Sequence, residues 1–140
     1  MTDYVLGFLF SPDWRKIALI QKLKPEWQRG SYNGIGGAIE EKDLGPFDAM
    51  HREFLEETGA HVRSWKLFAN LVNAVKDWRV SCFYTTDYMI DALKSPTEEQ
   101  VHVFTVKSLP ENLVGNVRWL IPMAMSMEYY KTNMYEINEH

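Results

Sequence analysis

The sequence predicts an α+β fold, an α/β/α sandwich in which helices cover the faces of a mixed β-sheet. Segments with the apolar patterns of strands outnumber helical ones, and the two predicted helices lie midway along the chain and near its C-terminal end. A sheet and a helix each bury an apolar face against a neighbouring layer, so this order of elements favours helices packed on a sheet. The 140 residues, 46% of them hydrophobic, are expected to form one domain over residues 1–140.

Apolar runs and alternating patterns predict the strands. Residues 4–10 form a near-continuous apolar run, which is typical of a buried strand, and a turn at residues 11–13 leads to a hairpin partner over residues 16–23. A short strand follows at residues 37–41, with Ile39 pointing inward. Three later segments have strand patterns, the first two joined by a turn: residues 61–74, 78–84 and 101–106.

The helices are predicted from their end signals and apolar faces. Pro46 suits a first helical position, where its missing N–H costs nothing, and Gly59 suits the residue just past a helix end, where φ is often positive. Apolar residues at i, i+3 and i+7 predict one buried face, made of Phe47, Met50 and Phe54. The second helix is predicted from Asn116, with Pro122 in its first turn, and the polar segment 131–140 is expected to be a frayed tail.

Composition argues against several classes of function. The formal net charge is −4, from 15 basic and 19 acidic residues, so no basic excess indicates nucleic-acid binding. The single cysteine, Cys82, cannot form an internal disulfide and suits a reducing cytosol. No apolar run approaches the roughly 18 residues of a membrane span, and the first residues do not resemble a secretory leader. We therefore expect a cytoplasmic protein that binds neither nucleic acid nor membrane.

The first helix concentrates carboxylates on one face. Glu53, Glu56 and Glu57 fall at i, i+3 and i+4, where like charges repel by roughly 0.2–0.5 kcal/mol per pair. A cation should offset this repulsion. Arg52 is one candidate, but adjacent residues on a helix do not face each other, so we expect it to brace a carboxylate or carbonyl elsewhere. The other candidate is a hard divalent ion such as Mg2+ or Mn2+. A solvated acidic helix face is the alternative.

A glycine-rich segment precedes this helix. Gly34, Gly36 and Gly37 occupy three of four consecutive positions. Glycines permit tight turns and close approach of the backbone to a ligand. A metal between this segment and the helix could therefore be held by carboxylates and a glycine carbonyl.

The two segments together resemble the Nudix box, with the pattern G-x5-E-x7-R-E-U-x-E-E-x-G-U, where U is apolar. The run REFLEETGA, residues 52–60, fits the second half at every specified position. The first half departs from the pattern. Asp43 stands in place of Glu after five intervening residues from Gly37, and eight residues, not seven, separate Asp43 from Arg52. We interpret this as a one-residue insertion in the box loop.

The resemblance implies the Nudix fold and hydrolysis of a nucleoside diphosphate linked to another group. It implies Mg2+ as the cofactor, with Mn2+ as the alternative, because divalent ions neutralise the diphosphate and lower the pKa of bound water. Arg52 would orient a box carboxylate. The implied metal ligands are Glu53, Glu56, Glu57 and the Gly37 carbonyl. The general base is open between Glu53 and a carboxylate just before the last predicted strand, Glu98 or Glu99.

Residues 27–37, W-x-x-G-x-Y-N-G-x-G-G, are similar to a segment of MutT-type nucleoside triphosphatases. This likeness implies that Asn33 contacts the base. The lysine that usually follows the glycine pair is Ala38 here, which removes one expected phosphate contact. Lys22 or Lys24, at the end of a predicted strand, could replace it.

A second part of the likeness to MutT-type proteins lies at the start of the last helix. Gly115 and Asn116 stand where acidic residues read the base in that group, and Trp119 follows. An amide in place of a carboxylate changes the pattern of donors and acceptors, so selectivity for an oxidised guanine is not implied. The substrate-binding set implied by both segments is Lys24, Asn33, Gly36, Asn116 and Trp119.

These resemblances imply a metal-dependent pyrophosphohydrolase that converts a (d)NTP, an oxidised purine nucleotide among the candidates, to NMP and pyrophosphate. The alternative substrates are ADP-ribose, a dinucleotide polyphosphate and a cap-like nucleotide. The alternative outside the enzymes is a non-catalytic nucleotide-binding module. The departures from the expected residues at Asp43 and Ala38 motivate this hypothesis. The expected partner is a small nucleotide, and the chain is expected to be a monomer or a homodimer.

Overall fold

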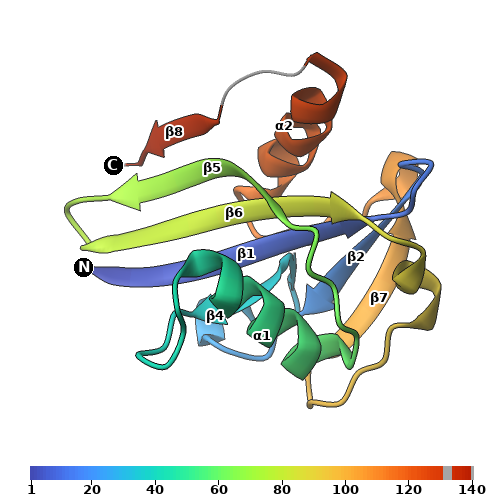
Figure 1. The fold of residues 1–140 in the computed structure, drawn as a ribbon, viewed down its shortest axis with the longest axis horizontal. Coiled ribbons are helices and arrows are strands. Elements are labelled where there is room, and N and C mark those ends of the chain that lie inside the picture. Colours follow the sequence, from blue (N-terminus) through green and yellow to red (C-terminus); the bar gives the residue numbers. More distant parts are fainter. Residues whose placement is uncertain (131–133, 140) are drawn as a thin grey trace.

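The computed structural model describes residues 1–130 and 134–139, and these form one eight-stranded mixed sheet with a helix on each face (Figure 1). The order across the sheet is β3-β2-β1-β6-β5-β8, while β4 pairs with β1 and β7 pairs with β2. The β1–β6 and β5–β8 pairs are parallel and the others are antiparallel. The strands are β1 (Thr2–Phe10), β2 (Lys16–Gln21), β3 (Tyr32–Asn33), β4 (Ile35–Ala38), β5 (Lys66–Asn73), β6 (Trp78–Thr86), β7 (Gln100–Thr105) and β8 (Tyr135–Asn138).

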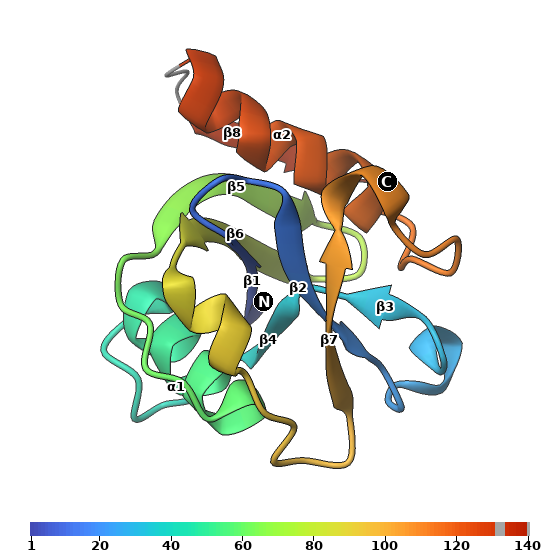
Figure 2. The same ribbon diagram turned by 90° about the vertical axis from the view of Figure 1, so that its right-hand side faces the viewer.

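The two helices, α1 (Pro46–Thr58) and α2 (Val117–Tyr130), cover opposite faces of the sheet (Figure 2). Each face has its own cluster of buried side chains, one containing Phe54 of α1 and the other Leu120 of α2. Strand β1 contributes to both, with Leu9 on the α1 side and Phe8 on the α2 side, which explains its unbroken apolar run. This arrangement confirms the predicted α/β/α sandwich.

Helix α1 begins and ends where its sequence predicts. Pro46 occupies the first turn, and Gly59 has φ of 76° with its N–H donating to the carbonyl of Leu55. Met50 and Phe54 are fully buried, as predicted, but Phe47 is 53% exposed. Phe47 lies in the first turn of the helix. Its ring packs edge-on against Phe83, with 4.9 Å between the ring centroids, but stays largely exposed to solvent.

Three strand predictions differ in detail from the structure. Strand β2 pairs with β1 at only two positions and with β7 along its whole length, so the predicted β1–β2 hairpin is short. The strand predicted at residues 37–41 is β4, Ile35–Ala38, and its buried residue is Ile35 rather than Ile39, which is half-buried. The segment predicted as a strand from residue 61 becomes one only at Lys66.

The C-terminal part departs most from the sequence-based expectation. Pro122 lies inside α2, beyond the first turn in which it was predicted. Of the predicted frayed tail, residues 131–133 and 140 lie outside the described residues, but Tyr135–Asn138 form β8. Strand β8 runs parallel to β5 and supplies hydrogen-bond partners to an edge that would otherwise be open. Among the described residues no helix is long and apolar enough to cross a membrane.

Candidate active site

The carboxylate face of α1 lies against the glycines of β4. A Cβ atom at Gly37 would stand 2.5 Å from Oε1 of Glu53, so a larger residue there would require this carboxylate to move. Glu53 is 8% exposed, and its burial raises the pKa of its carboxyl group, with Arg52 acting in the opposite direction. The structure thus brings together Gly37 and Glu53, which are sixteen positions apart in the sequence.

Arg52 supplies positive charge that offsets the repulsion among the glutamates of α1. Its Nη1 lies 3.0 Å from Oε1 of Glu53 and 3.2 Å from Oε2 of Glu56, and also 2.9 Å from Oε2 of Glu40. Its Nη2 donates to the carbonyl of Ala38 at 3.1 Å. The expectation that Arg52 would not reach Glu53 was wrong, because both long side chains bend toward β4 and meet there. Its predicted bracing of a carboxylate and a carbonyl elsewhere is present as well.

Asp43, the residue that departs from the box pattern, is the strongest partner of Arg52. Nε and Nη2 of Arg52 donate to Oδ1 and Oδ2 of Asp43 at 2.8 and 2.9 Å, a bidentate pair. The hydrogen bonds from Arg52 hold the pKa of Asp43 below its usual value, and this same pairing is the main cause that raises the pKa of Arg52. The N–H of Glu40 donates to Oδ2 of Asp43 and ties the box loop together.

Glu57 lies at the other end of the acidic face, near the loop that precedes β7. Thr97 donates from its hydroxyl to Oε2 of Glu57 at 3.3 Å. Burial raises the pKa of Glu57, and the charge of Glu99 raises it further, while Lys22 and Thr97 act in the opposite direction. This carboxylate therefore carries charge that its surroundings do not fully neutralise.

The residues fit a hard divalent cation by their chemistry, since Glu53, Glu56 and Glu57 all offer carboxylate oxygens. Burial is the main cause that raises the pKa values of Glu53 and Glu57, and a bound cation would favour their charged forms. Within residues 1–130 and 134–139, however, no three His, Cys, Asp or Glu side chains are grouped closely enough to hold an ion. Glu56 is turned toward Arg52, so ligation by all three glutamates requires rotation of the Glu56 side chain.

The two carboxylates considered as general bases outside the helix differ sharply. Oε1 of Glu99 accepts from Nζ of Lys22 at 3.0 Å, and Oε2 accepts from the N–H groups of Leu23 at 2.6 Å and Lys24 at 3.3 Å. Burial acts to raise the pKa of Glu99, but these hydrogen bonds outweigh it and lower the pKa. Glu98 is exposed.

Three of the predicted substrate-binding residues lie in or just after strands β2, β3 and β4. Asn33 pairs with Ile20 of β2 and so points to the α1 face, but its amide is engaged: Nδ2 donates to Gln28, and Oδ1 accepts from the N–H of Gly34. Gly36 is required by packing, since a Cβ there would lie 1.9 Å from the carbonyl oxygen of Val5. The side chain of Lys24 is exposed.

Asn116 and Trp119 stand at the start of α2, on the opposite face of the sheet from the carboxylates. The carbonyl of Asn116 accepts the first helical hydrogen bonds, and its side-chain Oδ1 is buried with no partner among the described residues. Trp119 packs against the α2-side core. The preceding segment pairs with β3, with Val114 donating to the carbonyl of Tyr32, so Asn116 approaches the edge of the sheet that carries Asn33.

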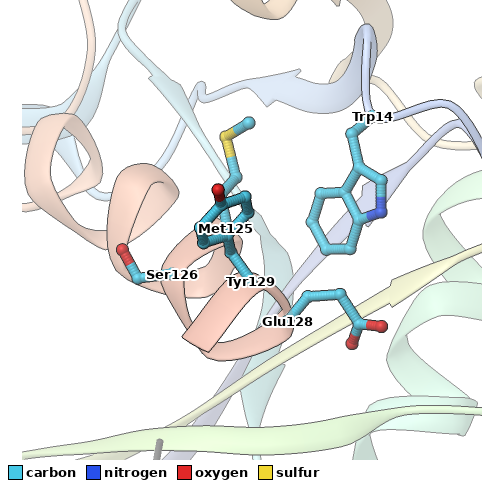
Figure 3. A pocket seen from close by; sticks show the side chains of 5 residues that line it. All are labelled: Trp14, Met125, Ser126, Glu128 and Tyr129. Atoms are coloured by element: carbon cyan, nitrogen blue, oxygen red, sulfur yellow. The ribbon is translucent and has the colours of Figure 1, made fainter. Parts of the chain in front are cut away.

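One cavity lies away from the carboxylates. It has a volume of about 680 Å³ and opens beside α2, where Figure 3 shows Trp14 facing the side chains of the helix. Its lining residues are Trp14, Met125, Ser126, Glu128 and Tyr129. None of these belongs to the predicted site. The sequence analysis did not predict the contact of Thr97 with Glu57, because no sequence pattern indicates a contact between residues forty positions apart.

Comparison with known proteins gives the same fold throughout. The NUDIX domain of Shewanella oneidensis NrtR, solved with ADP ribose, is 21% identical with a TM-score of 0.75, and the match covers 90% of this chain and 87% of that one. An ADP-ribose pyrophosphatase from Streptococcus suis is 16% identical with a TM-score of 0.73, covering 97% and 98%. The MutT protein of Bacillus halodurans is 17% identical with a TM-score of 0.70, covering 99% and 90%.

Sequence comparison defines the family. No curated protein sequence matches this chain. The family model of the NUDIX domain, however, matches residues 2–135, which is nearly the whole chain. Within that match lies the helix that carries Arg52 and the three glutamates. The chain therefore belongs to the NUDIX domain family.

Proposed function

We propose that this protein hydrolyses a nucleoside triphosphate to NMP and pyrophosphate with Mg2+ or Mn2+ as cofactor. The observation that carries the proposal is the acidic face of α1, where Glu53 packs on Gly37 and Arg52 braces two of the three glutamates. Such a face offers hard oxygen ligands beside a backbone that a phosphate chain can approach closely. The MutT-like segment around Asn33 supports a triphosphate substrate.

In the proposed mechanism, Glu56 and Glu57 hold the metal, and Arg52 fixes the orientation of Glu53 and Glu56. A bound divalent ion neutralises the phosphates and lowers the pKa of water. The water oxygen forms a bond to phosphorus while the bridging P–O bond breaks, which releases NMP and pyrophosphate. Glu53 accepts the proton of the water. We assign it this role because Arg52 engages only its Oε1, whereas both oxygens of Glu99 are occupied by donors.

The test is release of pyrophosphate and phosphate from a panel of nucleotides in Mg2+, Mn2+ and EDTA. The panel contains normal and oxidised (d)NTPs, ADP-ribose and a diadenosine polyphosphate. The proposal expects metal-dependent pyrophosphate release from at least one triphosphate. Turnover of other members alone would refute the triphosphate assignment. Nucleotide binding without any turnover would support the non-catalytic binding module instead.

ADP-ribose is the second candidate substrate, and a specific observation favours it. Two of the similar structures are an NrtR NUDIX domain solved with ADP ribose and a protein described as an ADP-ribose pyrophosphatase. The same carboxylate face would serve this substrate, because its reactive group is also a diphosphate. The products separate the two candidates, since ADP-ribose gives AMP and ribose phosphate without free pyrophosphate.

A further inference from the structure

The loop between residues 94 and 99 joins the end of α1 to the end of β2. At its start, the N–H of Lys94 donates to the carbonyl of Thr58, the last residue of α1, at 2.9 Å. At its end, the carboxylate of Glu99 accepts hydrogen bonds from Lys22, Leu23 and Lys24, which follow β2. The loop is therefore fixed at both ends.

Thr97 stands between these two anchors and reaches the acidic face of α1. Its hydroxyl has two acceptors within reach, Oε2 of Glu57 at 3.3 Å and the carbonyl of Glu99 at 3.4 Å. A carboxylate is the stronger acceptor because it is charged. The hydroxyl oxygen in turn accepts from the N–H of Glu99 at 3.2 Å, so the backbone of Glu99 holds this oxygen near Glu57.

Glu99 is the residue that keeps Thr97 in this place. The Lys22 and Glu99 side chains are only 19% and 15% exposed, so their ion pair is largely shielded from water. Both oxygens of Glu99 are engaged by donors from the β2 side. Its backbone N–H meanwhile holds the Thr97 hydroxyl, so the same residue connects β2 to the hydroxyl that faces Glu57.

We propose that Thr97 is a positioning residue that orients the Glu57 carboxylate for metal binding, and that Glu99 anchors Thr97 rather than acting as the general base. The inference rests on the proposed function, in which Glu57 is a metal ligand. With Oε2 held by Thr97, Oε1 of Glu57 has no hydrogen-bond partner among the described residues and can bind an ion. Partners that orient a metal-binding carboxylate typically contribute about 10- to 100-fold to metal affinity or activity.

The experiment measures Mn2+ binding by the loss of the free Mn2+ signal in electron paramagnetic resonance, together with the metal dependence of nucleotide hydrolysis. Thr97→Val removes the hydroxyl and keeps the side-chain shape, while Thr97→Ser keeps the hydroxyl. Thr105→Val, at an exposed position on β7, is the matched control. We expect Thr97→Val to weaken Mn2+ binding about 10-fold. Thr97→Ser should restore it and Thr105→Val should leave it unchanged.

A thermodynamic cycle with Glu57→Gln tests that Thr97 acts through Glu57. In the Glu57→Gln background, Thr97→Val should weaken Mn2+ binding no further, because the carboxylate it orients is gone. Equal Mn2+ affinity of the wild type and Thr97→Val overturns the inference. So does a loss of thermal stability in both Thr97 variants with unchanged metal affinity, which would indicate a structural role.

The metal titration separates this inference from the proposed function. If the wild-type protein hydrolyses no member of the nucleotide panel but binds Mn2+ in a manner that depends on Thr97, the proposed function fails and the inference stands. If hydrolysis is metal-dependent but insensitive to Thr97→Val, the inference fails alone. If the wild type binds no Mn2+, both fail.

Discussion

Arg52 and Asp43 form a bidentate ion pair, with N–O distances of 2.8 and 2.9 Å, that closes the box loop onto α1. Asp43 departs from the box pattern in residue type and in spacing, yet its side chain is only 2% exposed and both oxygens meet the guanidinium. Arg52 thus has a carboxylate partner in the box loop while it holds Glu53 and Glu56.

The first prediction concerns the stability contributed by this pair. Asp43→Asn should lower the free energy of unfolding by about 1–2 kcal/mol, since a hydrogen-bonded charge pair is lost and Arg52 is left partly unsatisfied. Chemical denaturation of the metal-free protein measures the change. Glu41→Gln is the control, because Glu41 is exposed in the same loop and makes no ion pair or hydrogen bond with the described residues. Equal effects of the two variants would contradict a specific role of Asp43.

The pH dependence of this stability difference follows from the lowered pKa of Asp43, whose main cause is the hydrogen bonding from Arg52. A carboxylate whose folded-state pKa is depressed contributes stability in full above its unfolded value, about 3.9, and loses it as the pH falls through the folded value. The gap between wild type and Asp43→Asn should therefore be constant from pH 5 to 7 and close below about pH 4. A gap that widens toward acid would contradict the pairing.

Gly37 offers a test of the contact between β4 and Glu53. Gly37→Ala places a Cβ 2.5 Å from Oε1 of Glu53, so the carboxylate must leave its position beside Arg52. The atoms that must move belong to the flexible end of the Glu53 side chain, so we expect little loss of stability but a fall in turnover, because the carboxylate is displaced. Gly115→Ala is the control, because nothing lies within 4 Å of a Cβ built there. Full activity of Gly37→Ala would show that the position of Glu53 is unimportant.

Features that depend on local sequence signals could be predicted, whereas features that depend on long-range contacts could not. Pro46 and Gly59 define α1 correctly because helix ends depend on the residues at those ends. The pairing of β8 with β5 joins segments more than sixty positions apart and left no local pattern. Phe47 has the helical spacing of the buried residues of α1, but it lies at the end of the helix where that face is no longer covered by the core. Its predicted burial was therefore wrong.

In the candidate site, too, local groupings could be predicted and long-range partners could not. The box motif grouped Arg52 with the glutamates of its own helix, and that grouping is present in the structure. The motif could not show that Asn33 already uses its amide for Gln28 and Gly34, nor that Glu99 is fully hydrogen-bonded. These partners come from loops whose conformations no periodicity determines.

Glu98 and Glu99 should respond differently to loss of charge. Glu99→Gln puts a donor or a neutral oxygen opposite Lys22, so we expect weaker metal binding but the same shape of the pH–rate profile. Glu98→Gln should leave activity unchanged, because Glu53 is the proposed base and Glu98 makes no side-chain hydrogen bond or ion pair with the described residues. If Glu99 were the general base, its loss would reduce turnover by about 10²–10⁴-fold and remove the acidic limb of the profile. Steady-state kinetics from pH 5 to 9 distinguish these outcomes.

The last prediction joins catalysis and stability at the acidic face. Glu56→Gln and Glu57→Gln should each reduce kcat by at least about 100-fold, the scale expected when a catalytic electrostatic group is lost. In EDTA, however, Glu57→Gln should raise the melting temperature, because burial and Glu99 raise the pKa of Glu57 and so make its charge unfavourable in the folded protein.

With Mn2+ added, the wild type should have the higher melting temperature. The ion stabilises the folded wild type by binding to it, whereas the Glu57→Gln variant lacks one ligand for the ion. Differential scanning calorimetry with and without Mn2+ makes the comparison, and Glu41→Gln controls for the loss of one negative charge. A melting temperature that responds equally to Mn2+ in wild type and Glu57→Gln would exclude Glu57 as a ligand. Unchanged turnover in both Glu56→Gln and Glu57→Gln would exclude the acidic face of α1 as the metal site.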